Sequence, residues 1–218
     1  MRRPKIVQIG FNKCATRSLA MLMEQNGLPV ADWQRGKLAV RCYKRMMKGE
    51  DPFADYPETV WFSDMEMTDS IFWHNIEFYK EYEYIWRHHP DAYYVLNTRN
   101  KADWLKSRIN HKNYLLYYRR FYRTFSRQKV IERWSEEWDL HHAAVLAFFA
   151  DKPGRLCIYD IDMDKPEKLA AFVAPHYKLE NLTMPRRGDT EARRTQSKWF
   201  RRPGWVKPWM WKWAVRGR

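Results

Sequence analysis

The chain has 218 residues, of which 17% are aromatic, including 12 Trp. This length allows one domain with a substantial core, and the aromatic content excludes an intrinsically disordered chain. The formal net charge of +14 favours an anionic partner, such as a nucleotide, an acidic glycan, a nucleic acid or an anionic lipid.

Cysteines and apolar runs exclude further classes of protein. The three cysteines (Cys14, Cys42 and Cys157) have no spacing typical of metal binding, and their odd number does not suggest a disulfide framework. No apolar run approaches the roughly 20 residues of a transmembrane helix. The N-terminal segment lacks the apolar core of a signal peptide. We therefore expect a cytoplasmic protein, and we expect no metal.

Apolar periodicity predicts the elements of the fold. In chain order, we expect a strand at residues 5–9, a helix at 16–25, a strand at 59–63, a helix at 69–86, a strand at 92–97, helices at 100–110 and 128–150, a strand at 155–159 and a helix at 166–173. This alternation predicts an α/β fold with a central, mostly parallel sheet flanked by helices. Ligands of such sheets bind beyond the carboxyl ends of the strands. Three segments that follow predicted strands are therefore candidates for ligand binding: residues 10–18, 63–66 and 98–107.

The first of these segments reads GFNKCATRS. A turn that leaves a strand and enters a helix directs several backbone N–H groups at one point, with the positive helix end behind them. Lys13 adds a charge, and Thr16 and Ser18 add hydroxyl donors. A phosphate or a sulfate fits this set. A tight strand–helix connection with a surface lysine would show the same pattern.

The third segment reads TRNKADWLKS and follows the same plan. Arg99 leaves the strand, and Ser107 lies eight residues later on the following helix. The guanidinium offers a fork of donors and the hydroxyl offers one directional bond, so the pair can hold one dianionic group.

Together the two segments resemble the motifs of sulfotransferases that use 3′-phosphoadenosine 5′-phosphosulfate (PAPS), especially the bacterial-type branch. The resemblance implies a P-loop-like sulfotransferase fold through about residue 178. It assigns the loop that holds the 5′-phosphosulfate to Lys13, Cys14, Ala15, Thr16, Arg17 and Ser18. Two positions depart from the family pattern. Ala15 replaces the usual Gly and disfavours a left-handed backbone, and Cys14 replaces a frequent Ser.

The same resemblance assigns Arg99 and Ser107 to the 3′-phosphate, with Asp103 at the usual Asp between them. Arg186 and Arg187, followed by Gly188, resemble the short motif with which cytosolic members complete this site. The positive charge is concentrated toward the C-terminus, so the chain is divided into a sulfotransferase domain at residues 1–182 and a basic, Trp-rich segment at 183–218.

Sulfuryl transfer requires in-line placement and relief of charge on the leaving phosphate. Lys13 is the candidate for the second task, by position and by resemblance. The acceptor, a hydroxyl or else an amine of a glycan, a lipid or a small molecule, needs a general base. Cytosolic members have a His after the middle strand, where this chain has Asp64 and Glu66. Asp64 is the first candidate and Glu66 the second, although Asp64 could instead cap a helix.

Three histidines lie near these motifs or on the long predicted helix. His111, beside the second motif, is a candidate for the acceptor site. His141 and His142 lie on the long predicted helix, where surface or packing roles are expected.

Residues 183–218 contain 11 Lys and Arg, two acidic residues and five Trp. This mixture suits an anionic membrane surface, and hence peripheral binding at the inner face of a membrane. It suits equally an anionic glycan, or packing back onto the domain.

Two other functions remain open from the sequence. One is a non-catalytic basic module that binds nucleic acid or membrane, whereas the enzyme is expected to bind no specific nucleic acid. The other is an ATP-dependent P-loop kinase, although the G-K-[ST] signature is missing. Variable segments at 32–56 and 113–127 are expected to form the acceptor walls.

Overall fold

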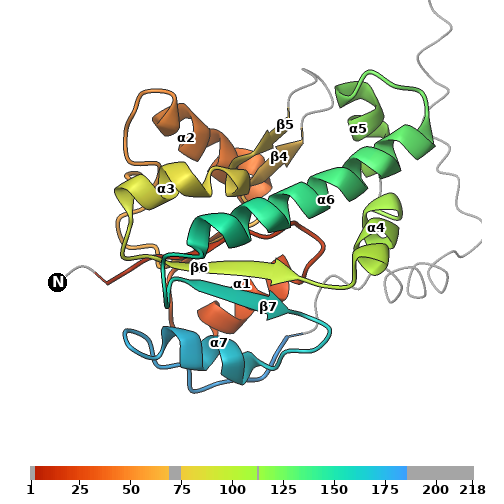
Figure 1. The fold of residues 1–218 in the computed structure, drawn as a ribbon. Helices are drawn as coiled ribbons and strands as arrows, with labels where there is room; N and C mark the ends of the chain where they lie inside the picture. The colour runs from red at the N-terminus through yellow and green to blue at the C-terminus, as the bar shows by residue number, and fades with distance from the viewer. Residues whose placement is uncertain (1–2, 69–74, 112, 186–218) are drawn as a thin grey trace, which may run out of the picture. The chain divides into compact units, whose positions relative to one another are not determined.

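Five short strands form a parallel sheet at the centre of the fold (Figure 1). The structure is a computed structural model that describes residues 3–68, 75–111 and 113–185. Within these ranges the order across the sheet is β2-β3-β1-β6-β7, and every pair is parallel. The strands are β1 (Ile6–Gln8), β2 (Val30–Asp32), β3 (Trp61–Ser63), β6 (Tyr93–Thr98) and β7 (Leu156–Asp160). The predicted α/β class with a central parallel sheet is confirmed.

Helices cover both faces of this sheet (Figure 1). On one side lie α1 (Thr16–Glu24) and α7 (Pro166–Val173). On the other side lie α2 (Lys37–Met46), α3 (Tyr82–His88), α4 (Lys101–Ile109), α5 (Tyr114–Phe121) and α6 (Arg127–Phe149). A two-stranded antiparallel ribbon, β4 (Glu66–Thr68) and β5 (Asn75–Glu77), follows the end of β3. Among the described helices, none is long and apolar enough to cross a bilayer.

The strands alternate between two apolar cores, as a period of two requires. Ile6 packs with α1 and α7, whereas Val7 packs with the helices of the opposite face. The same alternation holds for Trp61 and Phe62 of β3. Both faces of the sheet are therefore buried, and its ligand-accessible region is the edge where the strands end.

The predicted helix at 69–86 is wrong over its described first part. Residues 75–77 form β5, and 78–80 form a 3₁₀ turn before α3. The regularly spaced aromatic residues of this segment resemble a helical face, but Phe78 and Tyr79 bury their rings from the short turn. Arg186 and Arg187, predicted to complete the 3′-phosphate site, and residues 186–218 of the basic C-terminal segment lie outside the described residues.

Candidate functional site

The three segments selected from the sequence meet at one edge of the sheet. β1 has β3 on one side and β6 on the other, all parallel, so their carboxyl ends are neighbours. From β1 the chain runs through α1 toward β2 at one side, and from β6 it runs through α4–α6 toward β7 at the other. β1 and β6 therefore flank a topological switch point, where open α/β sheets bind their ligands.

Asn97 of β6 holds the first loop in place. Its buried amide Nδ2 donates to the backbone carbonyls of Phe11, over 3.1 Å, and of Cys14, over 2.8 Å. A side chain at Gly10 would prevent this approach, because a Cβ there would lie 2.1 Å from the Asn97 carbonyl oxygen. The glycine that opens the loop is thus required by its contact with β6.

Three more side chains hold carbonyls of the same loop. His141 Nε2 donates to the carbonyl of Ile9 over 2.7 Å, and burial lowers the pKa of His141 to about 4, so its ring stays neutral. Trp104 Nε1 donates to the carbonyl of Asn12 over 3.0 Å. Arg99 Nη1 donates to the carbonyl of Lys13 over 3.3 Å. Donors from β6, α4 and α6 therefore hold the carbonyls on one side of the loop.

Because the loop carbonyls are held on one side, the backbone N–H groups of the loop point to the opposite side. In a trans peptide the N–H points opposite to the preceding carbonyl, so the N–H groups of Asn12 through Ala15 face away from these donors. Within the described residues, the N–H groups of Cys14, Ala15, Thr16 and Arg17 donate to no other protein group. They precede or begin α1, whose positive end adds to the attraction for an anion.

The loop adopts a left-handed backbone at two positions that are not glycine. Lys13 has φ of 66° and Ala15 has φ of 56°. Ala15 was expected to disfavour this conformation, yet the surrounding contacts impose it. Such strain costs about 1–2 kcal/mol per residue and tends to gather at functional sites.

The side chains of the loop divide into buried and accessible groups. Cys14 has no exposed surface, and burial raises the pKa of its thiol far above the ordinary value, so the thiol stays protonated. Thr16 and Ser18 are each 6% exposed, and Arg17 is exposed.

Arg99 lies against the first loop. Besides the carbonyl of Lys13, its guanidinium contacts Asp162 Oδ1 over 3.5 Å. Its Nε is buried and has no partner among the described residues. Ser107 is half-buried on α4, and no hydrogen bond joins it to Arg99 in the described chain. Sequence reasoning missed Asp162, which also accepts the N–H of Asn100 over 3.1 Å.

Asp64 stands at the exit of β3 in a left-handed conformation, with φ of 49°. It caps no helix, because β4 follows it directly, so that alternative is wrong. Its half-buried carboxylate has no hydrogen-bond partner in the described ranges. Burial, together with the nearby negative charges of Asp32 and Glu66, raises the pKa of Asp64 to about 8, although Lys13 and Arg17 oppose the shift. A carboxyl with this pKa exchanges protons near neutrality.

Unlike Asp64, Glu66 is hydrogen-bonded and almost fully buried, with 3% of its surface exposed. Its oxygens accept hydrogen bonds from Asn12 Nδ2 over 2.5 Å, from the hydroxyls of Tyr114 and Tyr118, and from Thr68 Oγ1 over 3.0 Å. Burial raises the pKa of Glu66, and the positive charge of Arg108 opposes that rise. These four donors fix Glu66 as a support for Asn12, next to Lys13.

A buried arginine that the sequence did not single out completes this support. Arg108 has no exposed surface and donates to the hydroxyl of Tyr118 over 2.7 Å. Its guanidinium lies within cation–π distance of five aromatic rings: Phe11, Trp104, Tyr114, Tyr118 and Trp134. The helical spacing from Trp104 to Arg108, which places both on one face, is the only sequence signal that could have indicated it.

Lys13 and His111 are brought together across the site. The ammonium Nζ of Lys13 lies 2.8 Å from His111 Nδ1. His111 follows α4, so this contact joins the first loop to the end of the helix that carries Ser107. The candidate acceptor-site histidine is thus beside the candidate catalytic lysine.

No protein-family model matches the sequence, and no curated protein matches it significantly. In the part of the chain that the structure describes, no group of three or more His, Cys, Asp and Glu is arranged to hold a metal ion. Any functional assignment therefore depends on the geometry of the site.

Proposed function

We propose that the protein is a sulfotransferase that moves the sulfuryl group of PAPS to a hydroxyl, or else to an amine, of its acceptor. We propose with it a P-loop-like sulfotransferase fold. The observation that carries the proposal is the polarity of the loop after β1. Its carbonyls are held toward β6, α4 and α6, while four successive N–H groups, which have no other partner among the described residues, are left for an anion.

Two anionic groups of the donor substrate would be held at the two strand ends. The N–H groups of Cys14 through Arg17 and the ammonium of Lys13 suit the 5′-phosphosulfate. Arg99, whose buried Nε has no partner in the described residues, suits the 3′-phosphate together with Ser107. A buried, unpaired guanidinium donor is costly in the protein alone, so a bound anion offsets that cost.

The chemistry assigned to this chain's residues is simple. Asp64, when deprotonated, takes the proton of the acceptor hydroxyl. The acceptor oxygen then forms a bond to sulfur as the bond between sulfur and the bridging phosphate oxygen breaks. The electron pair stays on that oxygen, where Lys13 offsets the new negative charge. The products are a sulfate ester and 3′-phosphoadenosine 5′-phosphate.

The position of Asp64 supports this division of roles. Lys13 and Arg17 are close enough to lower the pKa of Asp64, so the carboxyl lies near the loop that would hold the sulfuryl group. Glu66, with its four donors and its 3% exposure, suits a positioning role. Incubating the protein with PAPS labelled in its sulfuryl group and with extracts of glycans, lipids and phenols tests the proposal. Transfer of the label to a product supports it, and a protein that transfers no label to any extract would contradict it.

A further inference from the structure

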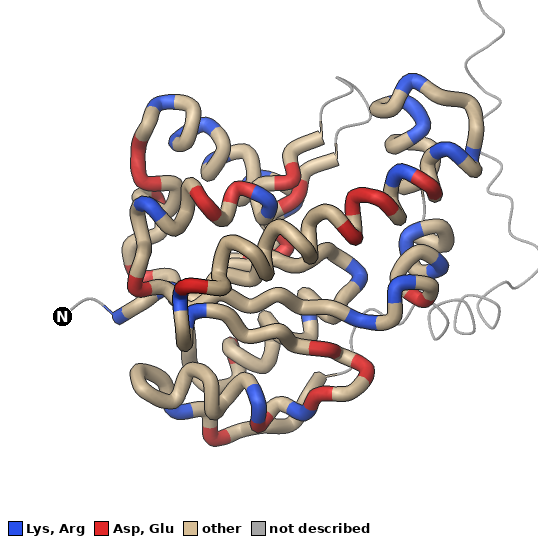
Figure 2. Tube along the Cα trace, in the orientation of Figure 1, with Lys and Arg blue, Asp and Glu red and all other residues tan. Residues whose placement is uncertain are grey.

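Several exposed cations lie on α2 and on the turns beside it, and Figure 2 marks the Lys and Arg of this region in blue. Three of them, Lys37, Arg41 and Lys44, are spaced four and three residues apart, which places them on one side of the helix. At 1.5 Å per residue, neighbouring charges rise by about 4.5–6 Å, and these three span about 10 Å. Arg35 precedes them in the turn before α2, and Lys48 follows in the turn after it.

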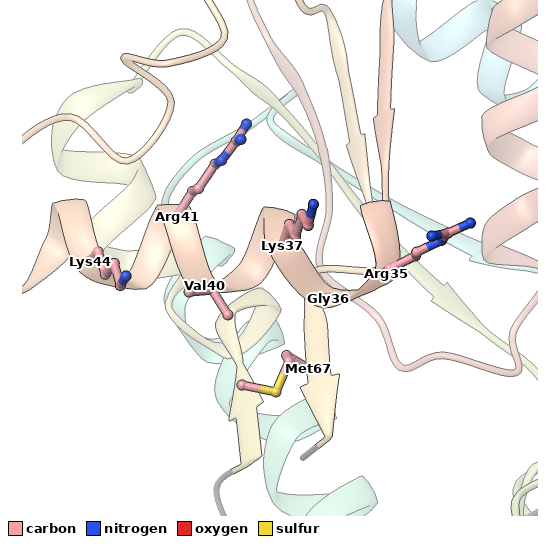
Figure 3. A pocket seen from close by; sticks show the side chains of 7 residues that line it. All are labelled: Arg35, Gly36, Lys37, Val40, Arg41, Lys44 and Met67. Atoms are coloured by element: carbon pink, nitrogen blue, oxygen red, sulfur yellow. The ribbon is translucent and has the colours of Figure 1, made fainter. Parts of the chain in front are cut away.

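The same face is hollowed. A cavity of about 250 Å³ lies beneath the first cations, and its apolar floor comes from Gly36, Val40 and Met67 (Figure 3). Gly36 makes room for the floor, because a Cβ there would lie 2.6 Å from Met67 Cγ. A second cavity of about 270 Å³ shares Arg41 and Lys44 with the first, and its other lining residues are Arg45, Lys48, Glu50 and Asp55. We call the two together the α2 groove.

The cations around the first cavity are not paired with carboxylates of the protein. In the described residues, Arg35, Lys37 and Lys44 have no hydrogen bond and no ion pair. The second cavity differs, because Glu50 and Asp55 line it and Arg45 pairs with both, with Glu50 over 2.7 Å. The positive charge beside the apolar floor of the first cavity is suited to a linear polyanion.

The α2 groove begins at the strand end beside the candidate base. The turn between β2 and α2 is tied to β3, since the N–H of Trp33 donates to the carbonyl of Ser63 over 3.2 Å. Ser63 directly precedes Asp64, and Met67 of the groove floor lies three residues beyond Asp64. A chain lying in the groove would therefore reach the base with one end.

The backbone of that turn is strained in a way that shapes the groove mouth. Trp33, Gln34 and Arg35 all have positive φ, at 46°, 51° and 58°. Three successive left-handed residues that are not glycine cost of order 1–3 kcal/mol each, and such strain persists only where the surroundings demand it. The turn sets Arg35 at the mouth of the groove (Figure 3).

We propose that the α2 groove binds the sulfuryl acceptor, and that this acceptor is a linear acidic glycan. This inference rests on the proposed function, because it is the reaction that requires an acceptor hydroxyl beside Asp64. Two other polyanions fit the groove less well. None of the described residues that line it has an aromatic side chain on which a nucleic-acid base could stack, and a hollow does not present apolar side chains to a membrane as an interfacial helix does.

The test compares two triple variants of the full chain with equal loss of charge. The groove variant is Lys37→Gln, Arg41→Gln and Lys44→Gln. The control variant is Lys129→Gln, Lys165→Gln and Lys178→Gln, exposed cations of the described chain that do not line the groove. The probe is polygalacturonate, a linear glycan with one carboxylate per sugar, at physiological ionic strength.

We expect the groove variant to bind polygalacturonate about tenfold more weakly, because three exposed ion pairs together correspond to about one decade of affinity. The control variant should bind like the unmodified protein. Polygalacturonate should also slow amide hydrogen exchange across residues 37–46 in the unmodified protein. Equal affinities of the two variants, or no added protection of α2, would overturn the inference.

Two further arms separate the possible partners. Polyuridylate, or vesicles that contain phosphatidylserine, replace the glycan as the probe. If the groove variant loses more affinity for either of these probes than for polygalacturonate, the choice of a glycan is overturned. Binding of 3′-phosphoadenosine 5′-phosphate is measured on the same variants. If the nucleotide binds and the groove variant still matches the control, the groove inference alone fails. If no nucleotide preference is found, the proposed function fails and the acceptor assignment fails with it.

Discussion

The guanidinium of Arg99 donates to the backbone carbonyl of Lys13 across 3.3 Å, although the two residues are 86 positions apart in the chain. This bond joins the loop after β1 to the end of β6. It places the two segments that the sequence indicated as anion sites in direct contact, and it fixes one carbonyl of the loop on the side away from the open N–H groups.

Asn97→Ala should destabilise the protein by about 2–4 kcal/mol, because the buried carbonyls of Phe11 and Cys14 lose their donor. Urea denaturation measures this change. Asn113→Ala is the matched control, since Asn113 is exposed and makes only one long side-chain bond, and it should change stability by less than about 0.5 kcal/mol. Equal stability of the two variants would contradict the role of Asn97.

Ala15→Gly should raise stability by about 0.5–1 kcal/mol, because relief of the left-handed strain exceeds the entropy that glycine costs. Ala144→Gly, in the exposed middle of α6, should lower stability by about 1 kcal/mol. Thermal and urea unfolding of both variants check the pair. A loss of stability in Ala15→Gly would mean that position 15 is not strained.

Asp64→Asn should lower turnover about 10²–10⁴-fold if Asp64 takes the acceptor proton. In the unmodified protein kcat/KM should rise with pH and level off above about pH 8, the pKa to which burial and nearby carboxylates bring Asp64. The rise should be absent from the variant. Near-normal turnover of Asp64→Asn, or an unchanged pH profile, would remove Asp64 as the base.

The raised pKa of Asp64 also determines how the stability of the protein should depend on pH. A carboxyl whose pKa is raised by folding favours the folded state when protonated, so its contribution is present below about pH 4 and is lost as the pH rises to about 8. The stability of the unmodified protein relative to Asp64→Asn should therefore fall across this range. Urea unfolding at a series of pH values tests the trend, and a constant difference would contradict the raised pKa.

The substitution Glu66→Gln tests whether Glu66 positions its neighbours or acts as the general base. The amide can accept some of the four hydrogen bonds to Glu66 but loses the charge opposite Arg108. We expect reduced turnover with the rise in kcat/KM near pH 8 retained, because Asp64 is unchanged. Disappearance of that rise in Glu66→Gln would make Glu66 the titrating base instead.

The sequence predicted the strand ends because their signals are local. The apolar runs of β1 and β6 and the Gly, Lys and Arg that follow them are read from adjacent residues, and the predicted helix at 166–173 matches α7. β2 is as short as β1 and β3, but only Ala31 of its three residues is buried, so it has no run of large apolar residues that would indicate a strand. The turn at residues 33–36 that leads into α2 is left-handed, which no ordinary turn signal indicates.

The supports of the candidate site could not be predicted for a different reason. His141 was expected to have a surface or packing role, and its bond to the carbonyl of Ile9 depends on how α6 crosses the sheet. Asp162 meets Arg99 only because β7 lies beside β6. Such contacts follow from tertiary packing and leave no spacing in the sequence.

The most direct test of the two-ended site is calorimetric titration with 3′-phosphoadenosine 5′-phosphate and with ADP. The unmodified protein should bind the first at least about 100-fold more tightly, a difference of about 2.7 kcal/mol, because only the first carries a 3′-phosphate for Arg99. Arg99→Ala should erase this preference, whereas Arg87→Ala, which removes an exposed charge on α3, should keep it. Equal affinities for the two nucleotides, or a preference that survives Arg99→Ala, would contradict the account.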